Sequence, residues 1–219
     1  KALKHQFDEG LTKMTIASDA LNSFKELSKF NELFPVLDDE IDNYVRHSYR
    51  GGWVYANPTY QDKDVENLQV FDVNSLYPSR MYECELPYDN PMYYQGKYQY
   101  DAEYPLFICR IQVAFSLKEH HLPTIQIKHN LRFIGTEYIT SCLPDPVELI
   151  LTSVDLKLFF DMYNVYSIKY VDGYKFKSIK EIFKDYIDKW NKVKMDNTGE
   201  GGKPALRTIA KLMLNSLYG

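Results

Sequence analysis

The segment 203–219 constrains the fold more than any other, because its residues separate onto two faces of one helix. Pro204 is tolerated in the first turn of a helix and predicts where this helix begins. An apolar face is formed at three- and four-residue steps by Leu206, Ile209, Ala210, Met213 and Leu217. A second face carries Lys203, Arg207, Lys211, Asn215 and Tyr218. We therefore expect a helix that packs by one face and presents cations on the other.

The charge around this helix is opposite in sign to that of the whole chain. The chain has a net charge of −4, whereas residues 187–219 hold six Lys or Arg against three Asp or Glu, a local +3. Such a face is usually just solvated, but no acidic residue interrupts this one. The contrast favours an anionic ligand. A triphosphate fits better than a carboxylate, because cations repeated over several helical turns can reach several phosphates.

A second informative segment is "VFDVNSLYPSRMY", residues 70–82. The hydrophobic run 68–73 predicts a strand that ends near Asp72. A carboxylate at a strand's end can bind Mg²⁺, with the carbonyl of Val73 as a further oxygen ligand. Alternatively, Asp72 caps a short helix at Leu76 or forms an Asx-turn before it. The capping role is the simpler interpretation of Asp72 alone, whereas a metal and triphosphate site explains both segments together.

Several other segments carry weaker signals. Gly51 and Gly52 in "YRGGWVY" predict either a strand bulge or the close approach of a ligand. Tyrosines crowd residues 82–104, where they would stack on bases, pack under loops or form a protein interface. We also expect a helix capped by Ser18 or Asp19, strands at 107–117 and 123–128, a helix from Thr152 or Ser153 to Met162, and a turn at 172–173.

The composition sets limits on the class of protein. At 219 residues, with 45% hydrophobic and 26% charged residues, the chain is long enough to bury a core. Its three cysteines are widely separated and lack CxxC spacing, which argues against a disulfide framework or a zinc site. No apolar run approaches the ~18 residues of a membrane span, so we expect no membrane partner and a cytosolic location.

Three motifs together resemble a known family. "DVNSLYPS", residues 72–79, resembles the first polymerase motif of family B DNA polymerases. "KLMLNSLYG", residues 211–219, is similar to the lysine-containing motif on their fingers helix. "YRGG", residues 49–52, is similar to the motif that joins their exonuclease and polymerase modules. "LPTIQIK" and "FKDYIDKW" resemble the protein-primed branch found in small linear-genome bacteriophages, and the resemblance covers essentially the full chain.

The resemblance implies a role for each matching residue. Asp72 would be one of two carboxylates that hold two catalytic Mg²⁺ ions, with the Val73 carbonyl on the nucleotide-bound ion. Ser75 would support the turn on the triphosphate side, and Tyr77 would exclude a ribose 2′-OH sterically. Lys211, Lys194 and Arg207 would bind the phosphates. Asn215, Tyr218 and Gly219 would face the nascent base pair or the template. The DNA backbone would be contacted by Tyr49, Gly51 and Gly52.

The implied function is protein-primed, template-directed DNA synthesis in the cytoplasm of a bacterial host. Its partners would be a DNA template-primer, dNTPs and a terminal protein that supplies the priming hydroxyl. The implied fold is α+β: part of an antiparallel polymerase palm bearing Asp72, an inserted region that contacts terminal protein, and part of the helical fingers. The expected divisions are an exonuclease tail at 1–12, the first part of the palm at 13–83, the insertion at 84–186 and the fingers helices at 187–219.

The resemblance also implies a second acidic motif downstream of the fingers, which these residues do not contain. We therefore expect an internal or truncated piece of a polymerase that is inactive alone. One alternative is a non-catalytic remnant that binds DNA or terminal protein. Another is a different palm polymerase such as a reverse transcriptase, which the asparagine and glycine of "NSLYG" disfavour.

Overall fold

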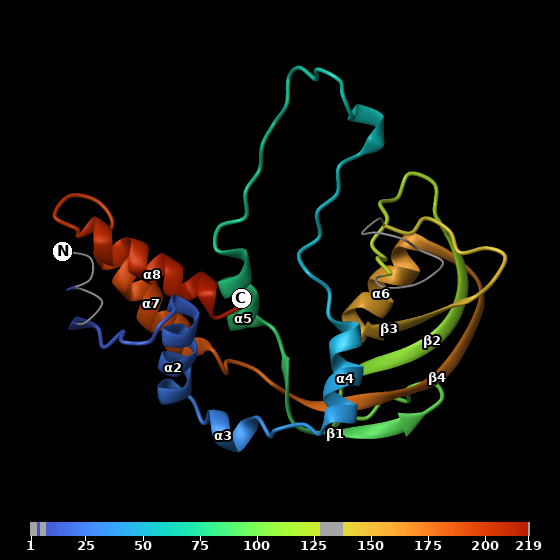
Figure 1. Cartoon of the computed structure of the whole chain (residues 1–219), viewed down its shortest axis with the longest axis horizontal. Coiled ribbons are helices and arrows are strands. Elements are labelled where there is room, and N and C mark those ends of the chain that lie inside the picture. Colours follow the sequence, from blue (N-terminus) through green and yellow to red (C-terminus); the bar gives the residue numbers. More distant parts are fainter. Residues whose placement is uncertain (1–3, 5–7, 128–137, 219) are drawn as a thin grey trace. The chain divides into compact units, whose positions relative to one another are not determined.

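The computed structural model describes residues 4, 8–127 and 138–218 (Figure 1). The chain forms two compact units, each built from segments far apart in sequence. Unit 1 comprises Lys1–Pro35, Val70–Asp89 and Ser178–Gly219, and unit 2 comprises Val36–Gln69 and Asn90–Lys177. Helices and an antiparallel sheet together confirm the predicted α+β class.

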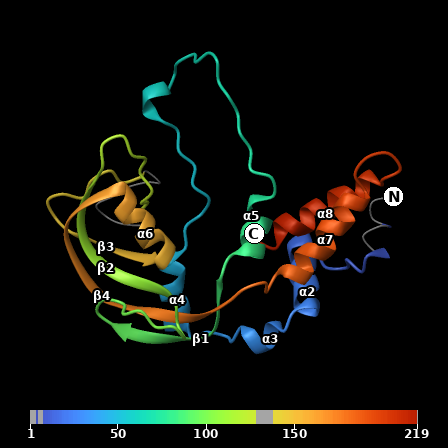
Figure 2. The same cartoon turned by 180° about the vertical axis from the view of Figure 1, so that it is seen from behind.

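Unit 1 is mainly helical. Its elements are α2 (Ile16–Leu27), α3 (Phe30–Leu33), α5 (Leu76–Glu83), α7 (Lys184–Asp196) and α8 (Pro204–Ser216). Helices α7 and α8 lie side by side, with α2 against them (Figure 2). The two run antiparallel, because the Tyr186 hydroxyl donates to the Met213 carbonyl at 2.7 Å near one end and Arg207 contacts Thr198 near the other. The predicted helix start at Pro204 is confirmed.

The core of unit 1 explains why α7 and α8 pair. Trp190 is fully buried, and its Nε1–H donates to the Ser23 hydroxyl at 3.3 Å, which ties α7 to α2. Phe24 of α2 stacks on Phe183 with ring centroids 4.5 Å apart. The apolar face of α8 completes this cluster, so burial of that face holds the three helices together.

Unit 2 contains a four-stranded sheet in the order β1-β4-β2-β3. The strands are β1 (Leu86–Gln95), β2 (Leu106–Leu117), β3 (Val147–Thr152) and β4 (Tyr163–Ile179), and β1 and β4 continue along the chain into unit 1. Strand β2 is antiparallel to both β3 and β4, so that Cys109 faces Leu151 on one side and Gly173 on the other. The remaining elements are α4 (Asp39–Ser48), η1 (Pro58–Tyr60) and α6 (Ser153–Met162).

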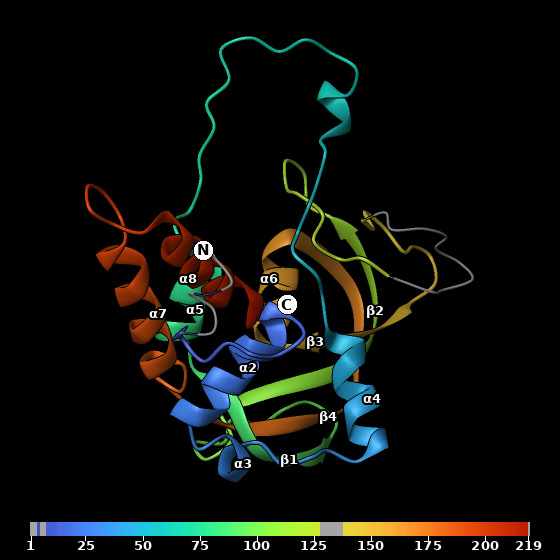
Figure 3. The same cartoon turned by 60° about the vertical axis from the view of Figure 1, so that its left-hand side comes forward.

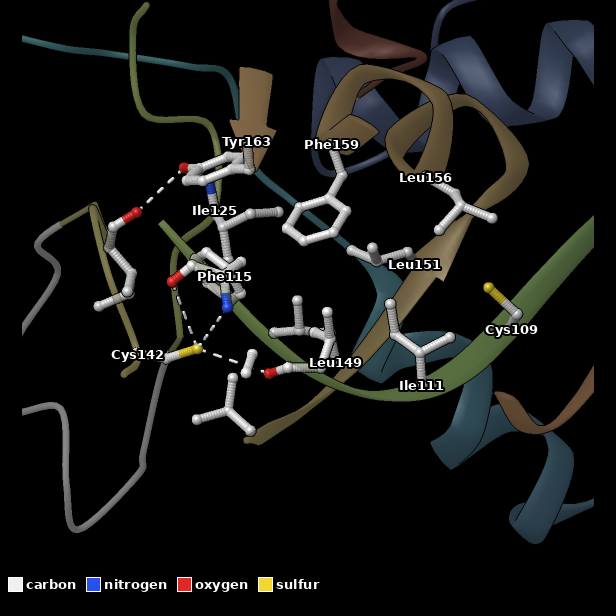
Figure 4. Packing of buried hydrophobic residues seen from close by; sticks show 14 residues of the cluster. Cys109, Ile111, Phe115, Ile125, Cys142, Leu149, Leu151, Leu156, Phe159 and Tyr163 are labelled. Atoms are coloured by element: carbon white, nitrogen blue, oxygen red, sulfur yellow. Dashed lines mark hydrogen bonds between the residues drawn. The ribbon is translucent and has the colours of Figure 1, made fainter. Parts of the chain in front are cut away.

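One face of this sheet packs against α6 (Figure 4). The Phe115 ring of β2 meets Phe159 and Tyr163 edge to face, with centroids 5.2 and 4.9 Å apart. The buried Tyr163 hydroxyl donates to the Ile139 carbonyl at 3.0 Å and accepts from the Thr124 amide at 2.8 Å. Its polar atom is therefore satisfied inside an apolar cluster.

Helix α4 lies beside the sheet of the same unit (Figure 3). Its Ile41, Tyr44 and Val45 side chains pack against a smaller cluster there. The Tyr44 hydroxyl donates to the Asp172 carboxylate at 3.2 Å. Arg110 also binds that carboxylate, with Nε 2.9 Å from its Oδ1. The Tyr44 hydroxyl therefore ties the middle of α4 to this charge pair on strands β2 and β4.

Three local predictions are wrong. Residues 68–73 form no strand, and Val70 and Phe71 are 94% and 85% exposed. A strand needs a hydrogen-bonded neighbour, and no segment of the described chain pairs with this one. Asp72, which was expected on an antiparallel sheet, therefore lies in no strand of the described chain. Instead of a turn, Asp172 and Gly173 lie inside the continuous strand β4, and residues 123–127 form only a bridge at Gln126.

The predicted caps had mixed outcomes. Thr152 caps α6, whose end at Met162 was also expected. At α2 the cap is Thr15, whose hydroxyl accepts from the Ser18 amide at 3.1 Å, while Asp19 lies within the first turn.

The unit boundaries place residues 36–69 with 90–177. The names exonuclease tail, palm, insertion and fingers stay predictions.

Candidate functional site

The polar face of α8 is presented to solvent as the sequence predicted. Lys203, Arg207, Lys211 and Asn215 are exposed. Ile209, Ala210 and Met213 on the opposite face are buried, and Leu206 and Leu217 pack partly buried against the same cluster. Leu214 is also buried and was not predicted, because it lies at the border of the apolar stripe. The amphipathic pattern therefore correctly predicted that the cationic side chains of α8 lie on its solvent-exposed face.

These cations are not neutralised locally. Within the described chain, no ion pair involves Lys194, Lys203, Arg207 or Lys211. The neighbouring Lys192 differs, since its ammonium lies 3.0 Å from the Asp196 carboxylate. The excess positive charge of residues 187–219 is thus concentrated on groups that can still bind an anion.

Residues 74–75 form a turn that leads into α5. Ser75 has φ +51° and ψ +45°, a left-handed conformation uncommon for a residue with a side chain. It is the N-cap residue of α5, yet its hydroxyl makes no capping bond. Instead, the Ser75 Oγ accepts a hydrogen bond from the Lys194 Nζ at 3.3 Å. This bond joins the turn to α7 and brings together two residues that the resemblance assigned to the triphosphate.

Asp72 precedes this turn and is exposed. Its predicted alternative role as the helix cap is wrong, because Ser75 occupies the N-cap position of α5. Among the described residues its carboxylate has no hydrogen-bond or ion-pair partner, so both oxygens are accessible to a hard cation. No group of three or more His, Cys, Asp or Glu side chains that could hold a metal occurs in the described residues. Asp72 and a backbone carbonyl fit Mg²⁺ only as part of a larger ligand set.

Two aromatic residues of the predicted site touch each other. Tyr77 of α5 stacks on Tyr218, just past α8, with ring centroids 4.2 Å apart and planes at 23°. Both rings remain partly open, with 41% and 47% of their surface exposed. Pro78 is buried in the first turn of α5, where its missing N–H costs no helical bond. The Tyr77 ring is therefore carried on a well-anchored turn.

The remaining predicted residues lie elsewhere. Tyr49, Gly51 and Gly52 are exposed in unit 2, just after α4, where the two glycines line a pocket of about 820 Å³. They belong to no strand, and neither glycine has a positive φ, so the predicted bulge is wrong. Gly219 lies outside the described residues.

Sequence reasoning missed Arg50, which lies between the residues assigned to DNA. Its guanidinium donates to the carbonyls of His47 at 2.9 Å and Ile150 at 3.2 Å, and burial lowers the pKa of Arg50. The position within "YRGG" was the only available signal.

Among the described helices none is long and apolar enough to span a bilayer.

Comparisons with known proteins give one consistent result. The sequence profile of the family described as "DNA polymerase type B, organellar and viral" matches residues 1–219. The chain is 49% identical to the DNA polymerase of Bacillus phage Nf and 45% identical to that of Bacillus phage phi29, over 100% of this chain and 38% of each polymerase. The chain therefore spans about two fifths of these relatives.

Solved structures agree with the sequence comparison. The structure of phi29 DNA polymerase complexed with primer-template DNA and incoming nucleotide substrates matches with a TM-score of 0.91 at 45% identity. That match covers 100% of this chain and 38% of the phi29 chain. The post-translocation complex with primer-template DNA matches with a TM-score of 0.90.

Proposed function

Because the chain belongs to the organellar and viral type B DNA polymerases, we propose that it supplies the nucleotide-binding part of a template-directed deoxynucleotidyl transferase. One observation carries this proposal. The Lys194–Ser75 bond and the Tyr77–Tyr218 stack bring the turn after Asp72 and the cationic face of α8 into one unit. A triphosphate with its Mg²⁺ needs both kinds of group close together.

Each residue then has a chemical task. Asp72 and the Val73 carbonyl would hold Mg²⁺, which neutralises the triphosphate and aligns the primer hydroxyl for in-line attack. Lys211, Lys194 and Arg207 bind the phosphate oxygens, and Ser75 keeps the turn beside them. The Tyr77 ring excludes a ribose 2′-OH by its bulk.

The nascent base pair lies beyond the sugar in this proposal. Asn215 and Tyr218 contact it from the end of α8, and Gly219 leaves room for the template base. Tyr218 then has to separate from Tyr77 when a nucleotide enters, since the two rings are stacked in this structure. Nucleotide entry thus requires a movement of the α8 end relative to α5.

The DNA and the priming partner are further parts of the proposal. Two matched phi29 polymerase structures are complexes with primer-template DNA, and one of them also holds incoming nucleotide substrates, which supports both ligands. Tyr49, Gly51 and Gly52 would contact the DNA backbone, and the inserted region of residues 84–186 would contact a terminal protein. Replication would take place in the cytoplasm of a bacterial host, as the phage relatives suggest.

A second candidate function is a non-catalytic module that binds DNA or terminal protein. It is favoured by the absence of a metal-binding acidic cluster from the described residues. This alternative predicts salt-sensitive DNA binding without nucleotide binding. Because the 219 residues span only 38% of each phage polymerase that they match, we expect them alone to perform no templated synthesis. Robust primer extension by the isolated chain with Mg²⁺ would contradict that expectation.

Calorimetric titration of the chain with dATP and Mg²⁺ separates the two functions. We expect saturable binding that Lys211→Ala weakens about tenfold or more, because a charge-assisted contact to phosphate is lost. Lys192→Ala is the matched control, since its ammonium already pairs with Asp196 and its loss should change affinity less than about twofold. Absence of binding by the unmodified chain, or equal effects of both variants, would refute the nucleotide site.

A further inference from the structure

The loop between α7 and α8, residues 197–203, is organised by two polar side chains. Asn197 donates from Nδ2 to the Val193 carbonyl at 2.8 Å, and its Oδ1 accepts from the Lys203 amide at 3.1 Å. The Thr198 hydroxyl donates to the Lys194 carbonyl at 2.7 Å. The same oxygen accepts a hydrogen bond from the Arg207 Nε at 3.2 Å. Thr198 therefore bridges the two helices at the residues that carry two of the site's cations.

A threonine hydroxyl has one hydrogen to donate and lone pairs to accept with. Because that hydrogen is committed to the Lys194 carbonyl, a lone pair of Oγ is left facing the Arg207 Nε. A guanidinium anchored through Nε keeps its two terminal nitrogens free for bidentate contact with an oxyanion. Donation to the carbonyl also strengthens the oxygen as an acceptor.

We propose that Thr198 is a positioning residue for triphosphate binding, which holds the Arg207 guanidinium in the orientation that a phosphate requires. The proposal rests on the nucleotide site described above and adds a residue that no motif identified. Lys194 is restrained in a similar way, since its ammonium donates to the Ser75 hydroxyl at 3.3 Å. Long cationic side chains restrained before binding lose less conformational entropy when the ligand arrives.

The neighbouring helix offers a matched control. The Thr208 hydroxyl of α8 donates to the Pro204 carbonyl at 3.0 Å, the same four-residue backward bond that Thr198 makes to Lys194. Both threonines are exposed. Within the described residues, however, no cationic side chain donates to the Thr208 hydroxyl. Valine at either position removes the hydroxyl and preserves the shape, so the two variants differ mainly in the contact to Arg207.

The test is calorimetric titration with dATP and Mg²⁺, with dAMP as the probe that lacks the outer phosphates. We expect Thr198→Val to weaken dATP binding about three- to tenfold, which corresponds to the net contribution of a typical hydrogen bond. Binding of dAMP should change less than about twofold. Thr208→Val should bind both probes like the unmodified chain, and Thr198→Ser should restore dATP binding. Equal melting temperatures for all variants would show that the fold is retained.

A double-mutant cycle identifies the route of the effect. In an Arg207→Ala background, Thr198→Val should cause no further loss of dATP affinity. An equal loss in both backgrounds would overturn the proposal, because the effect would then not pass through Arg207. Unchanged dATP binding by Thr198→Val would also overturn it while the nucleotide site stands. If the unmodified chain binds no dATP, the proposed function itself fails.

Discussion

Gly173→Ala tests how closely the two central strands of unit 2 approach each other. Gly173 of β4 faces Cys109 of β2, and a Cβ at this position would lie 2.2 Å from the Ile108 carbonyl oxygen and 2.4 Å from the Tyr94 hydroxyl. Ordinary van der Waals contact begins at 3.4 Å. The methyl group must therefore displace both atoms. This displacement breaks the 3.2 Å hydrogen bond that the Tyr94 hydroxyl donates to the Ile108 carbonyl.

The cost follows from these two displacements. Loss of the hydrogen bond removes about 1 kcal/mol, and overpacking between paired strands costs about 1–3 kcal/mol. We expect the free energy of unfolding of unit 2 to fall by about 3 kcal/mol. Since each 1.4 kcal/mol is tenfold, amide hydrogen exchange in β2 and β4 should become about 100-fold faster where exchange requires unfolding of the unit.

Hydrogen exchange followed by mass spectrometry measures this directly on peptides from β2 and β4. Gly51→Ala is the control in the same unit, because a Cβ there meets nothing within 4 Å and the φ of Gly51 is not positive. It should leave the protection of both strands unchanged, while lowering DNA affinity if Gly51 touches the DNA backbone. Native-like protection in Gly173→Ala would refute the close approach of the strands.

Two further predictions concern buried ionisable groups. Burial raises the pKa of Tyr186 and Tyr44 above the ordinary value of 10.0. The unfolded chain therefore releases protons above pH 10 that the folded chain retains. The contribution of these two tyrosines to stability is unchanged below this pH and falls above it, by at most about 1.4 kcal/mol per pH unit for each tyrosine. Urea unfolding at pH 8 to 11.5 checks this, and a constant free energy throughout would contradict it. With a thiol reagent at pH 8, only Cys84 should react readily, because Cys109 and Cys142 are 1% and 0% exposed. Fast labelling of all three would show that the core of unit 2 is open.

Helix periodicity predicted the local structure well for elements whose buried face follows from their own sequence pattern. The start of α8 follows from the tolerance of Pro204 in a first helical turn, and its buried stripe and exposed cations follow from three- and four-residue spacing. The α6 cap at Thr152 follows from hydroxyl chemistry at a helix start. These features depend on few distant residues, so a single sequence is enough.

Predictions failed where distant segments decide the structure. Residues 68–73 have the composition of a strand, but no described segment lies beside them to complete a ladder. Asp172 and Gly173 look like a turn, yet their pairing with Arg110 and Cys109 of β2 makes them part of a long strand. Likewise, motif order placed Ser75 and Lys194 in one site, but only the fold shows that their side chains touch.

Thr198 shows the same limit within the site. A threonine in a glycine-rich loop carries no periodic or motif signal, and its role depends on Arg207 of the next helix. Position in space, rather than residue type, makes it a candidate. Residues of this kind can be found only after the two helices are placed together.

The central claim is that Asp72 holds Mg²⁺ for nucleotide transfer beside the cationic face of α8. It can be tested in a chimera in which these residues replace the matching region of the Bacillus phage Nf DNA polymerase, which is 49% identical over this chain. We measure templated nucleotide incorporation for the unmodified chimera, for Asp72→Asn, and for Asp64→Asn as a control carboxylate with no assigned role. Loss of a metal ligand should slow incorporation by about 1,000-fold or more in Asp72→Asn alone, or about 4 kcal/mol in the barrier. Incorporation by Asp72→Asn at the rate of an active unmodified chimera would contradict the account.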